Sequence, residues 1–481
     1  MKKKLINKLK NMSEGAKSAL AYTIATLFSG ALSIITAPIF ARIMTTSQIG
    51  IVNLFNSWYT LISAFATLSL TSGGYVVALN TFSDNRDEYQ SSVLSLTSLI
   101  ALLLAVLYLI SPGFWSNLTG LSQPLLILML FGFLFAPATD FWFARQKFEY
   151  KYKKPVAIIM ISAIISSIIS VIVVLIMNKS SANSVVNGRL YANYLIIFGI
   201  AAILWFSTFI KGKVFFNARY WRFSLSLSIP LVGYSIAAQL LSVSDRVMIS
   251  KMVDDSAVGI YGTLYTISSL SLIVWQAIHA SYVPFLFNSI GKKGTKVKKI
   301  TNSLVVIYAF IALVLTFFAP EIVHILATAE YYEAIYIMPP IAAGIFLTCI
   351  TNIYSDIPVY FRKTKYVMYP AAIAAVLNIF LNYIFIPVYG YMVAAYTTLF
   401  SYIIWAVLQS YWCKKVCEMS DIKSNTLFDN KYLSIISFIT IMFCLTGILL
   451  YRNTILRYLV IIITSVIGIV FVYKQKGTKK L

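Results

Sequence analysis

The sequence predicts an all-α polytopic membrane protein with about 14 transmembrane helices. Hydrophobic residues make up 59% of the 481 residues and charged residues only 11%, whereas soluble domains are about 25% charged. Apolar runs of about 20 residues, enough to cross a bilayer core of roughly 30 Å, recur along the whole chain. They must be helices, because strands of membrane barrels alternate in short segments and lipid cannot hydrogen-bond an open backbone.

Fourteen such runs divide the chain, and only short polar segments separate them. In order they cover about 17–41, 49–79, 91–111, 124–144, 155–177, 190–210, 223–250, 258–288, 302–320, 335–360, 366–386, 391–411, 432–450 and 456–473. No soluble domain fits between them. We expect the paired glycines in "TSGGY", residues 71–75, either to let the second span bend or to allow close helix packing.

The distribution of basic residues predicts the orientation. In this span assignment, 32 of the 39 Lys and Arg residues lie on one side. Basic residues near span ends stay cytoplasmic, so both termini are expected on the cytoplasmic side of the membrane. The basic N-terminal segment is expected to be an arm on the inner leaflet rather than a cleaved signal, since its small residues precede the apolar run. The net charge of +23 is therefore mostly topology, and nucleic acid is not an expected partner.

One short pattern occurs twice, 209 positions apart. "RIMTTSQIGI" at 42–51 follows the first span, and "KMVDDSAVGI" at 251–260 follows the seventh. A shift of six spans preserves orientation, so the repeat predicts two parallel, pseudo-symmetric six-helix lobes around a central cavity that opens by alternating access. We expect an N-lobe at 1–211, a C-lobe at 212–430, and two further helices at 431–481.

These patterns, together with "LNYIFIPVYGYMVAAYTTLFSY" at 381–402, resemble the polysaccharide exporters of the multidrug/oligosaccharidyl-lipid/polysaccharide exporter superfamily. Within it the chain resembles the Wzx-type flippases for O-antigen and capsule repeat units. The resemblance implies transfer of undecaprenyl-diphosphate-linked oligosaccharide from the cytoplasmic to the outer leaflet. It also implies that residues 431–481 form a groove for the polyprenyl tail. Membrane lipids and the downstream polysaccharide polymerase machinery are further implied partners.

Charges inside spans are costly and are therefore candidate functional residues. Asp245 and Arg246 lie roughly 12 Å below the turn at Asp254 at ~1.5 Å per residue. Arg246 is a candidate for binding phosphate or an acidic sugar, with Asp245 holding it or taking a coupling cation. The alternative is an inter-helix ion pair that only locks packing. Tyr261 and Tyr265, on one face of the next span, are candidates for stacking on sugar rings.

The other candidates have simpler alternatives. Arg42 and Lys251 form the repeat-related basic pair, which is either interfacial or a gate that contacts phosphate. Asp140 and Asp356 lie near the cytoplasmic ends of their spans and either bind a coupling proton or sodium ion or pair with nearby basic residues. Those basic residues are Arg145 and Arg362, which also mark the cytoplasmic entrance for the lipid head. His279 is either a proton relay or a hydrogen-bonded helix contact.

Two other functions compete with the flippase. A cation-coupled drug antiporter of the same superfamily would suit twelve spans, whereas this chain has two more. A membrane glycosyltransferase or polymerase would need a loop domain or a catalytic carboxylate motif, and the sequence has neither. The four cysteines lie in or beside spans, where a metal or redox role is not expected. The sequence indicates no cofactor beyond a coupling proton or sodium ion.

Overall fold

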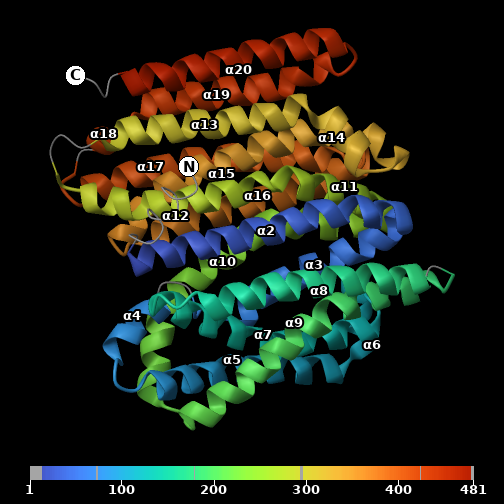
Figure 1. Cartoon of the computed structure of the whole chain (residues 1–481), viewed down its shortest axis with the longest axis vertical. Helices are drawn as coiled ribbons and strands as arrows, with labels where there is room; N and C mark the ends of the chain where they lie inside the picture. Colours follow the sequence, from blue (N-terminus) through green and yellow to red (C-terminus); the bar gives the residue numbers. More distant parts are fainter. Residues whose placement is uncertain (1–12, 72–73, 178, 293–295, 423, 478–481) are drawn as a thin grey trace, which may run out of the picture. The chain divides into compact units, whose positions relative to one another are not determined.

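A computed structural model describes residues 13–71, 74–177, 179–292, 296–422 and 424–477. The chain divides between Gln239 and Leu240 into two compact units. The first unit contains α2 (Glu14–Ile43), α3 (Thr46–Ala66), α4 (Gly74–Thr81), α5 (Arg86–Ile110), α6 (Pro112–Thr119), α7 (Gln123–Phe148), α8 (Lys153–Met177), α9 (Ala182–Gly212) and the first part of α10 (Ala218–Met252) (Figure 1). The predicted basic arm falls mostly on residues 1–12, outside the described residues.

The second unit begins within α10. It continues with α11 (Asp255–Ser269), α12 (Ser271–Ser289), α13 (Val297–Phe317), α14 (Ala319–Leu326), the 3₁₀ helix η1 (Ala329–Ile337), α15 (Met338–Tyr360), α16 (Lys365–Tyr389), α17 (Val393–Glu418), α18 (Ser424–Leu427), α19 (Asn430–Gly447), η2 (Ile448–Leu450) and α20 (Thr454–Gly477). The predicted lobe boundary at 211/212 coincides with the end of α9, and the six-span lobes remain a prediction.

The predicted all-α membrane fold is confirmed. In the described ranges there is no strand, and 12 helical segments are long and apolar enough to cross a membrane, or 13 if the bent α10 is one span. The fourteenth predicted span corresponds to α20. Every apolar run of the sequence therefore has a helical counterpart.

Two predicted spans are interrupted. The run at 49–79 is divided into α3 and α4. Leu68 and Ser69 follow the end of α3 with φ of 47° and 50°, and two left-handed residues without a glycine cannot continue a right-handed helix. Part of the "TSGGY" segment, residues 72–73, lies outside the described residues, so the interruption already begins before the glycines. The run at 258–288 is likewise divided into α11 and α12.

The repeated sequence forms the same local structure twice. Thr45 caps α3 by accepting a hydrogen bond from the Gln48 N–H at 3.2 Å, and Gln48 completes a capping box. Asp254, in the matching column, caps α11 by accepting from the Ala257 N–H at 2.7 Å. Each cap satisfies a backbone donor that the first helical turn leaves unpaired. The repeat therefore encodes a capped turn between two helices.

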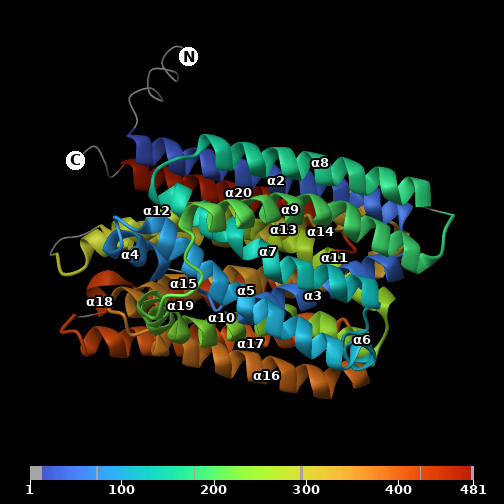
Figure 2. The same cartoon turned by 90° about the horizontal axis from the view of Figure 1, so that it is seen from below.

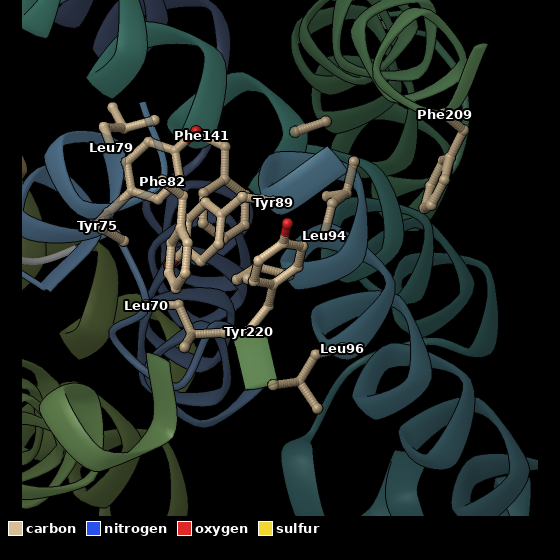
Figure 3. Packing of buried hydrophobic residues seen from close by; sticks show 13 residues of the cluster. Leu70, Tyr75, Leu79, Phe82, Tyr89, Leu94, Leu96, Phe141, Phe209 and Tyr220 are labelled. Carbon is tan, nitrogen blue, oxygen red and sulfur yellow. The ribbon is translucent and has the colours of Figure 1, made fainter. Parts of the chain in front are cut away.

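Helices within each unit pack along their lengths. In the first unit α9 packs against both α7 and α8, α2 lies on α8, and α5 contacts both α7 and α9 (Figure 2). Aromatic residues of α4, α5, α7 and α10 gather in one buried cluster together with Phe82, which directly follows α4. The cluster includes Tyr75, Tyr89, Phe141 and Tyr220 (Figure 3). The Tyr89 hydroxyl lies 2.6 Å from the Ser224 Oγ, which joins the cluster to α10.

In the second unit α15 packs between α17, α13 and α19, and α16 packs on α17. The last two helices are held by polar contacts as well as by apolar surface. Arg457 of α20 is buried and forms an ion pair with Glu321 of α14, and the Tyr458 hydroxyl donates to the same carboxylate at 2.8 Å. The Tyr451 hydroxyl donates to the Thr316 carbonyl at 2.8 Å.

Candidate functional site

Asp245 and Arg246 lie on α10 and are both buried. The Asp245 carboxylate accepts two hydrogen bonds, from the Tyr261 hydroxyl at 2.6 Å and from the Arg246 backbone N–H at 2.8 Å. Among the described residues no ion pair joins the Asp245 carboxylate to the Arg246 guanidinium. The two charges therefore have different neighbours, as expected of adjacent residues on a helix.

The Arg246 guanidinium lies over the Tyr265 ring, with its central carbon 4.3 Å from the ring centroid. This is the geometry of a cation–π contact. It also donates one hydrogen bond, to the Ser242 carbonyl at 3.2 Å. A guanidinium has five N–H donors, so within the described part of the chain most of its donors have no protein acceptor.

The structure brings four of the predicted site residues into one cluster on α10 and α11, formed by Asp245, Arg246, Tyr261 and Tyr265. Tyr261 is fully covered and its hydroxyl is used by Asp245, while Tyr265 is covered by the guanidinium. In this conformation neither ring has an open face for a sugar. Their role in stacking on the substrate stays a prediction, whereas the structure gives both of them a role in positioning the charges.

A second group of polar residues beside this cluster was not predicted. Asn378 of α16 accepts from the Ser244 hydroxyl at 3.2 Å and donates to the Thr398 hydroxyl at 3.1 Å. The Asn382 amide donates to Asn378 at 3.3 Å and accepts from the Thr397 hydroxyl. Two asparagines four residues apart in an apolar run share one helix face, and this spacing was the signal that could have identified them.

His279 of α12 and Asp356 of α15 form a second charged pair. The His279 Nε2 lies 3.0 Å from the Asp356 Oδ2, and the imidazole stacks near Trp275 with ring centroids 5.2 Å apart. His279 therefore makes a hydrogen-bonded contact between helices, and its role as a proton relay stays a prediction. The predicted pairing of Asp356 with Arg362 is wrong, because the imidazole takes the carboxylate and Arg362 lies past the helix end with an exposed side chain.

Asp140 is likewise not paired with Arg145. The Arg145 guanidinium bonds to Asp87, to Glu149 and to the Gln90 side chain instead. Burial alone raises the pKa of the Glu149 carboxyl, but hydrogen bonds from Lys151 and Arg145 bring it below its ordinary value. Arg145 therefore takes part in an ion-pair network at the end of α7 and does not pair with Asp140.

Asp140 instead borders a cavity inside the first unit. The cavity has a volume of about 340 Å³ and lies between α3, α7 and the first part of α10. The Asp140 side chain is exposed to it. Among the ion pairs of described residues, none includes Asp140, so its charge faces the cavity directly.

The remaining candidates lie at helix ends. Arg42 is in the last turn of α2 and Lys251 in the last turn of α10, and both side chains are exposed. Their matching positions follow from the repeated turn. The described residues contain no group of three or more His, Cys, Asp or Glu that could hold a metal ion.

A family model described as "Polysaccharide biosynthesis protein" matches residues 16–290, and a second, described as "MatE", matches residues 230–384. The first match covers more than half of the chain. The chain belongs to the polysaccharide biosynthesis protein family. No curated protein sequence matches it.

Solved structures share the fold of this chain. An inward closed conformation of the lipid II flippase MurJ matches with a TM-score of 0.65 and 18% identity, covering 95% of this chain and 99% of that one. An inward-facing multidrug resistance MATE family transporter matches with a TM-score of 0.61 and 11% identity, covering 83% and 99%. A Vibrio cholerae MATE transporter matches with a TM-score of 0.51 and 13% identity, covering 85% of this chain and 99% of that one. The predicted polysaccharide family is confirmed by the family model, and the fold is the one that these flippase and transporter structures share.

Proposed function

We propose that this chain is a flippase that moves undecaprenyl-diphosphate-linked oligosaccharide repeat units from the cytoplasmic to the outer leaflet of a bacterial cytoplasmic membrane. The product would serve O-antigen, capsule or exopolysaccharide synthesis, and polymerase machinery would take it up. Membership of the polysaccharide biosynthesis protein family and the fold shared with a lipid II flippase support this proposal. Both termini are cytoplasmic in this proposal, as the distribution of basic residues predicts.

The observation that carries the proposal is the Arg246 guanidinium inside α10. A buried cation is costly in a membrane, and among the described residues no ion pair includes Arg246, so its position inside a span needs a reason. Most of its donors have no acceptor among the described residues, and a guanidinium binds phosphate oxygens with two parallel hydrogen bonds. A diphosphate that passes through the protein would supply that missing acceptor. Arg42 and Lys251 would meet the same group near the exit, and Arg145 and Arg362 at the entrance.

Transport against a gradient would need a coupling proton or sodium ion. The His279 and Asp356 pair is the first candidate for its site, because both groups change charge with a proton and link two helices. Asp245 and Asp140 are the other carboxylates inside spans. The two C-terminal helices, α19 and α20, would hold the polyprenyl tail.

The second candidate function is cation-coupled antiport of a drug or other small molecule. The MatE match over 230–384 and the MATE transporter fold favour it. Buried carboxylates such as Asp245 would suit a cationic drug. A membrane enzyme has no such support, and the relatives by fold are a flippase and transporters.

The test is the sidedness of lipid-linked oligosaccharide in cells that lack this protein. A membrane-impermeant reagent that modifies sugars would be applied to intact cells or spheroplasts. We expect complete lipid-linked repeat units to accumulate on the cytoplasmic side and to reach the outside when the gene is restored. If they reach the outer leaflet without the protein, the flippase proposal fails and antiport becomes the leading function.

A further inference from the structure

The cavity beside Asp140 contains hydrogen-bonding groups that the protein itself does not use. Asp140, the Tyr59 and Thr60 hydroxyls, the Ser235 hydroxyl and the Gln239 amide all border it. None of these side-chain groups makes a hydrogen bond with another described residue. Polar groups in a membrane protein are normally paired with other protein groups or with water. This concentration of donors and acceptors that no described residue uses therefore points to a polar ligand.

The wall of the cavity holds its polar groups in fixed positions. The Tyr59 ring stacks on Phe133 of α7 with centroids 5.3 Å apart and planes 9° apart. Gly132 permits this contact, because a Cβ at that position would lie 2.6 Å from the Tyr59 ring and 2.5 Å from Phe198. The Tyr59 hydroxyl is therefore presented on a rigid ring, which lowers the entropy lost when it binds a ligand.

The composition of the wall limits the ligand. Among the described residues that border the cavity, Asp140 is the one charged group and none is basic. Lys147, two turns further along α7, is turned to the Tyr22 ring at 5.0 Å. A phosphate or a sugar acid would meet the negative charge of the Asp140 carboxylate here, whereas a group rich in hydroxyls would find an acceptor for two of its protons. The volume of about 340 Å³ is at the lower end of ligand pockets, roughly 300–1,000 Å³.

We infer that this cavity is a subsite for one uncharged sugar ring of the transported head group, with Asp140 accepting hydrogen bonds from neighbouring sugar hydroxyls. The inference rests on the proposed function and adds a selectivity to it. Neutral sugars are accepted at this position and sugar acids are rejected by the carboxylate.

The test measures sugar binding to the purified protein in nanodiscs by saturation-transfer NMR. The probes are glucose, galactose, N-acetylglucosamine and glucuronate, each titrated at constant sodium concentration. We expect at least one neutral sugar to bind, with glucuronate about tenfold weaker. Asp140→Asn should weaken the neutral sugar about tenfold and reduce the difference from glucuronate. Thr139→Val, the adjacent residue of α7 that borders a different cavity, is the matched control and should bind as the wild type does.

Tyr59→Phe removes only the hydroxyl and decides the question if Asp140→Asn does not fold. It should weaken the neutral sugar several-fold. Binding of no neutral sugar, equal binding of glucuronate, or equal binding by both variants would overturn the inference. Sodium will also be titrated without sugar. If sodium stabilises the wild type but not Asp140→Asn, the cavity is a cation site and the inference is overturned. These binding measurements do not depend on lipid transfer. A negative result would therefore overturn the sugar subsite without overturning the flippase, and a negative sidedness result would overturn the flippase whatever the binding measurements show.

Discussion

The His279 imidazole and the Asp356 carboxylate meet at 3.0 Å between α12 and α15, and both side chains are mostly covered. The two residues are 77 positions apart in the sequence, and each was predicted separately as a candidate for ion coupling. Because they are in contact, they form one candidate site rather than two. A carboxylate inside a membrane protein without a donor would cost free energy, so the imidazole stabilises the position of Asp356.

We expect His279→Leu to destabilise the protein by about 1–3 kcal/mol, because it leaves a buried carboxylate without its donor. Asp356→Asn should cost less, since its amide can still bond to the imidazole. Thermal unfolding of the protein in detergent measures both. His324→Leu is the control, because His324 is exposed. Equal midpoints for His279→Leu and His324→Leu would show that the pair contributes nothing to stability.

Replacement of Arg246 should separate binding from folding. Arg246→Ala should reach the membrane in normal amounts but export lipid-linked oligosaccharide about tenfold less or worse, since a charge-assisted hydrogen bond contributes about 1.5–3 kcal/mol. Arg246→Lys should restore only part of the activity, because an ammonium cannot bind two phosphate oxygens in parallel. Arg452→Ala removes an exposed arginine and is the control. Wild-type export by Arg246→Ala at normal expression removes this residue from the site.

Tyr261→Phe tests whether the Asp245 carboxylate depends on its donor. The substitution removes a 2.6 Å hydrogen bond to a fully buried acid, and a loss of about 1–3 kcal/mol of stability is expected. Tyr282→Phe is the matched control, because its 2.7 Å partner is the neutral Thr301 hydroxyl. A double-mutant cycle with Asp245→Asn gives the coupling energy. No coupling between the two positions would contradict the pairing.

The helices could be predicted from the sequence because apolar runs of bilayer length allow no other structure. The breaks within spans could not, since the end of α3 depends on left-handed backbone at Leu68 and Ser69, which no residue type at those positions demands. Ion pairs were predicted from proximity along the chain, and this failed for Asp140 and Asp356. The partners come from other helices instead: Asp87 of α5 pairs with Arg145, and His279 of α12 pairs with Asp356.

The site was partly predictable for the same reason. Charged residues in spans are conspicuous in a sequence, so Asp245 and Arg246 were found, and the nearby tyrosines share a helix face with period four. The asparagines of α16 were missed because amides are less conspicuous than charges. Tyr59, Ser235 and Gln239 come from helices far apart in the sequence, and only the fold brings them to one cavity.

The contact between Arg457 and Glu321 should hold the last helix to α14. Arg457 is 2% exposed, and removal of one partner of a buried pair leaves the other charge unpaired, which costs about 3–5 kcal/mol. Glu321 is partly exposed, so a smaller loss is expected for Glu321→Ala. Thermal unfolding measures the loss of stability, and limited proteolysis after residue 447 measures the release of the last helix. Glu14→Ala breaks the exposed pair with Lys17 and should change neither measurement.

The repeated turns allow a comparison of the two caps. Thr45→Ala and Asp254→Ala each remove a side-chain acceptor from the first turn of a helix, and each should cost about 0.5–2 kcal/mol of stability. Asp254 should cost more, because its bond to the Ala257 N–H is shorter and its carboxylate also interacts with the positive end of the helix. Thr45→Ser and Asp254→Asn keep an acceptor and are the matched controls. If both alanine variants unfold at the wild-type temperature, the repeated sequence has not been retained for helix capping, and a gating role for these turns gains support.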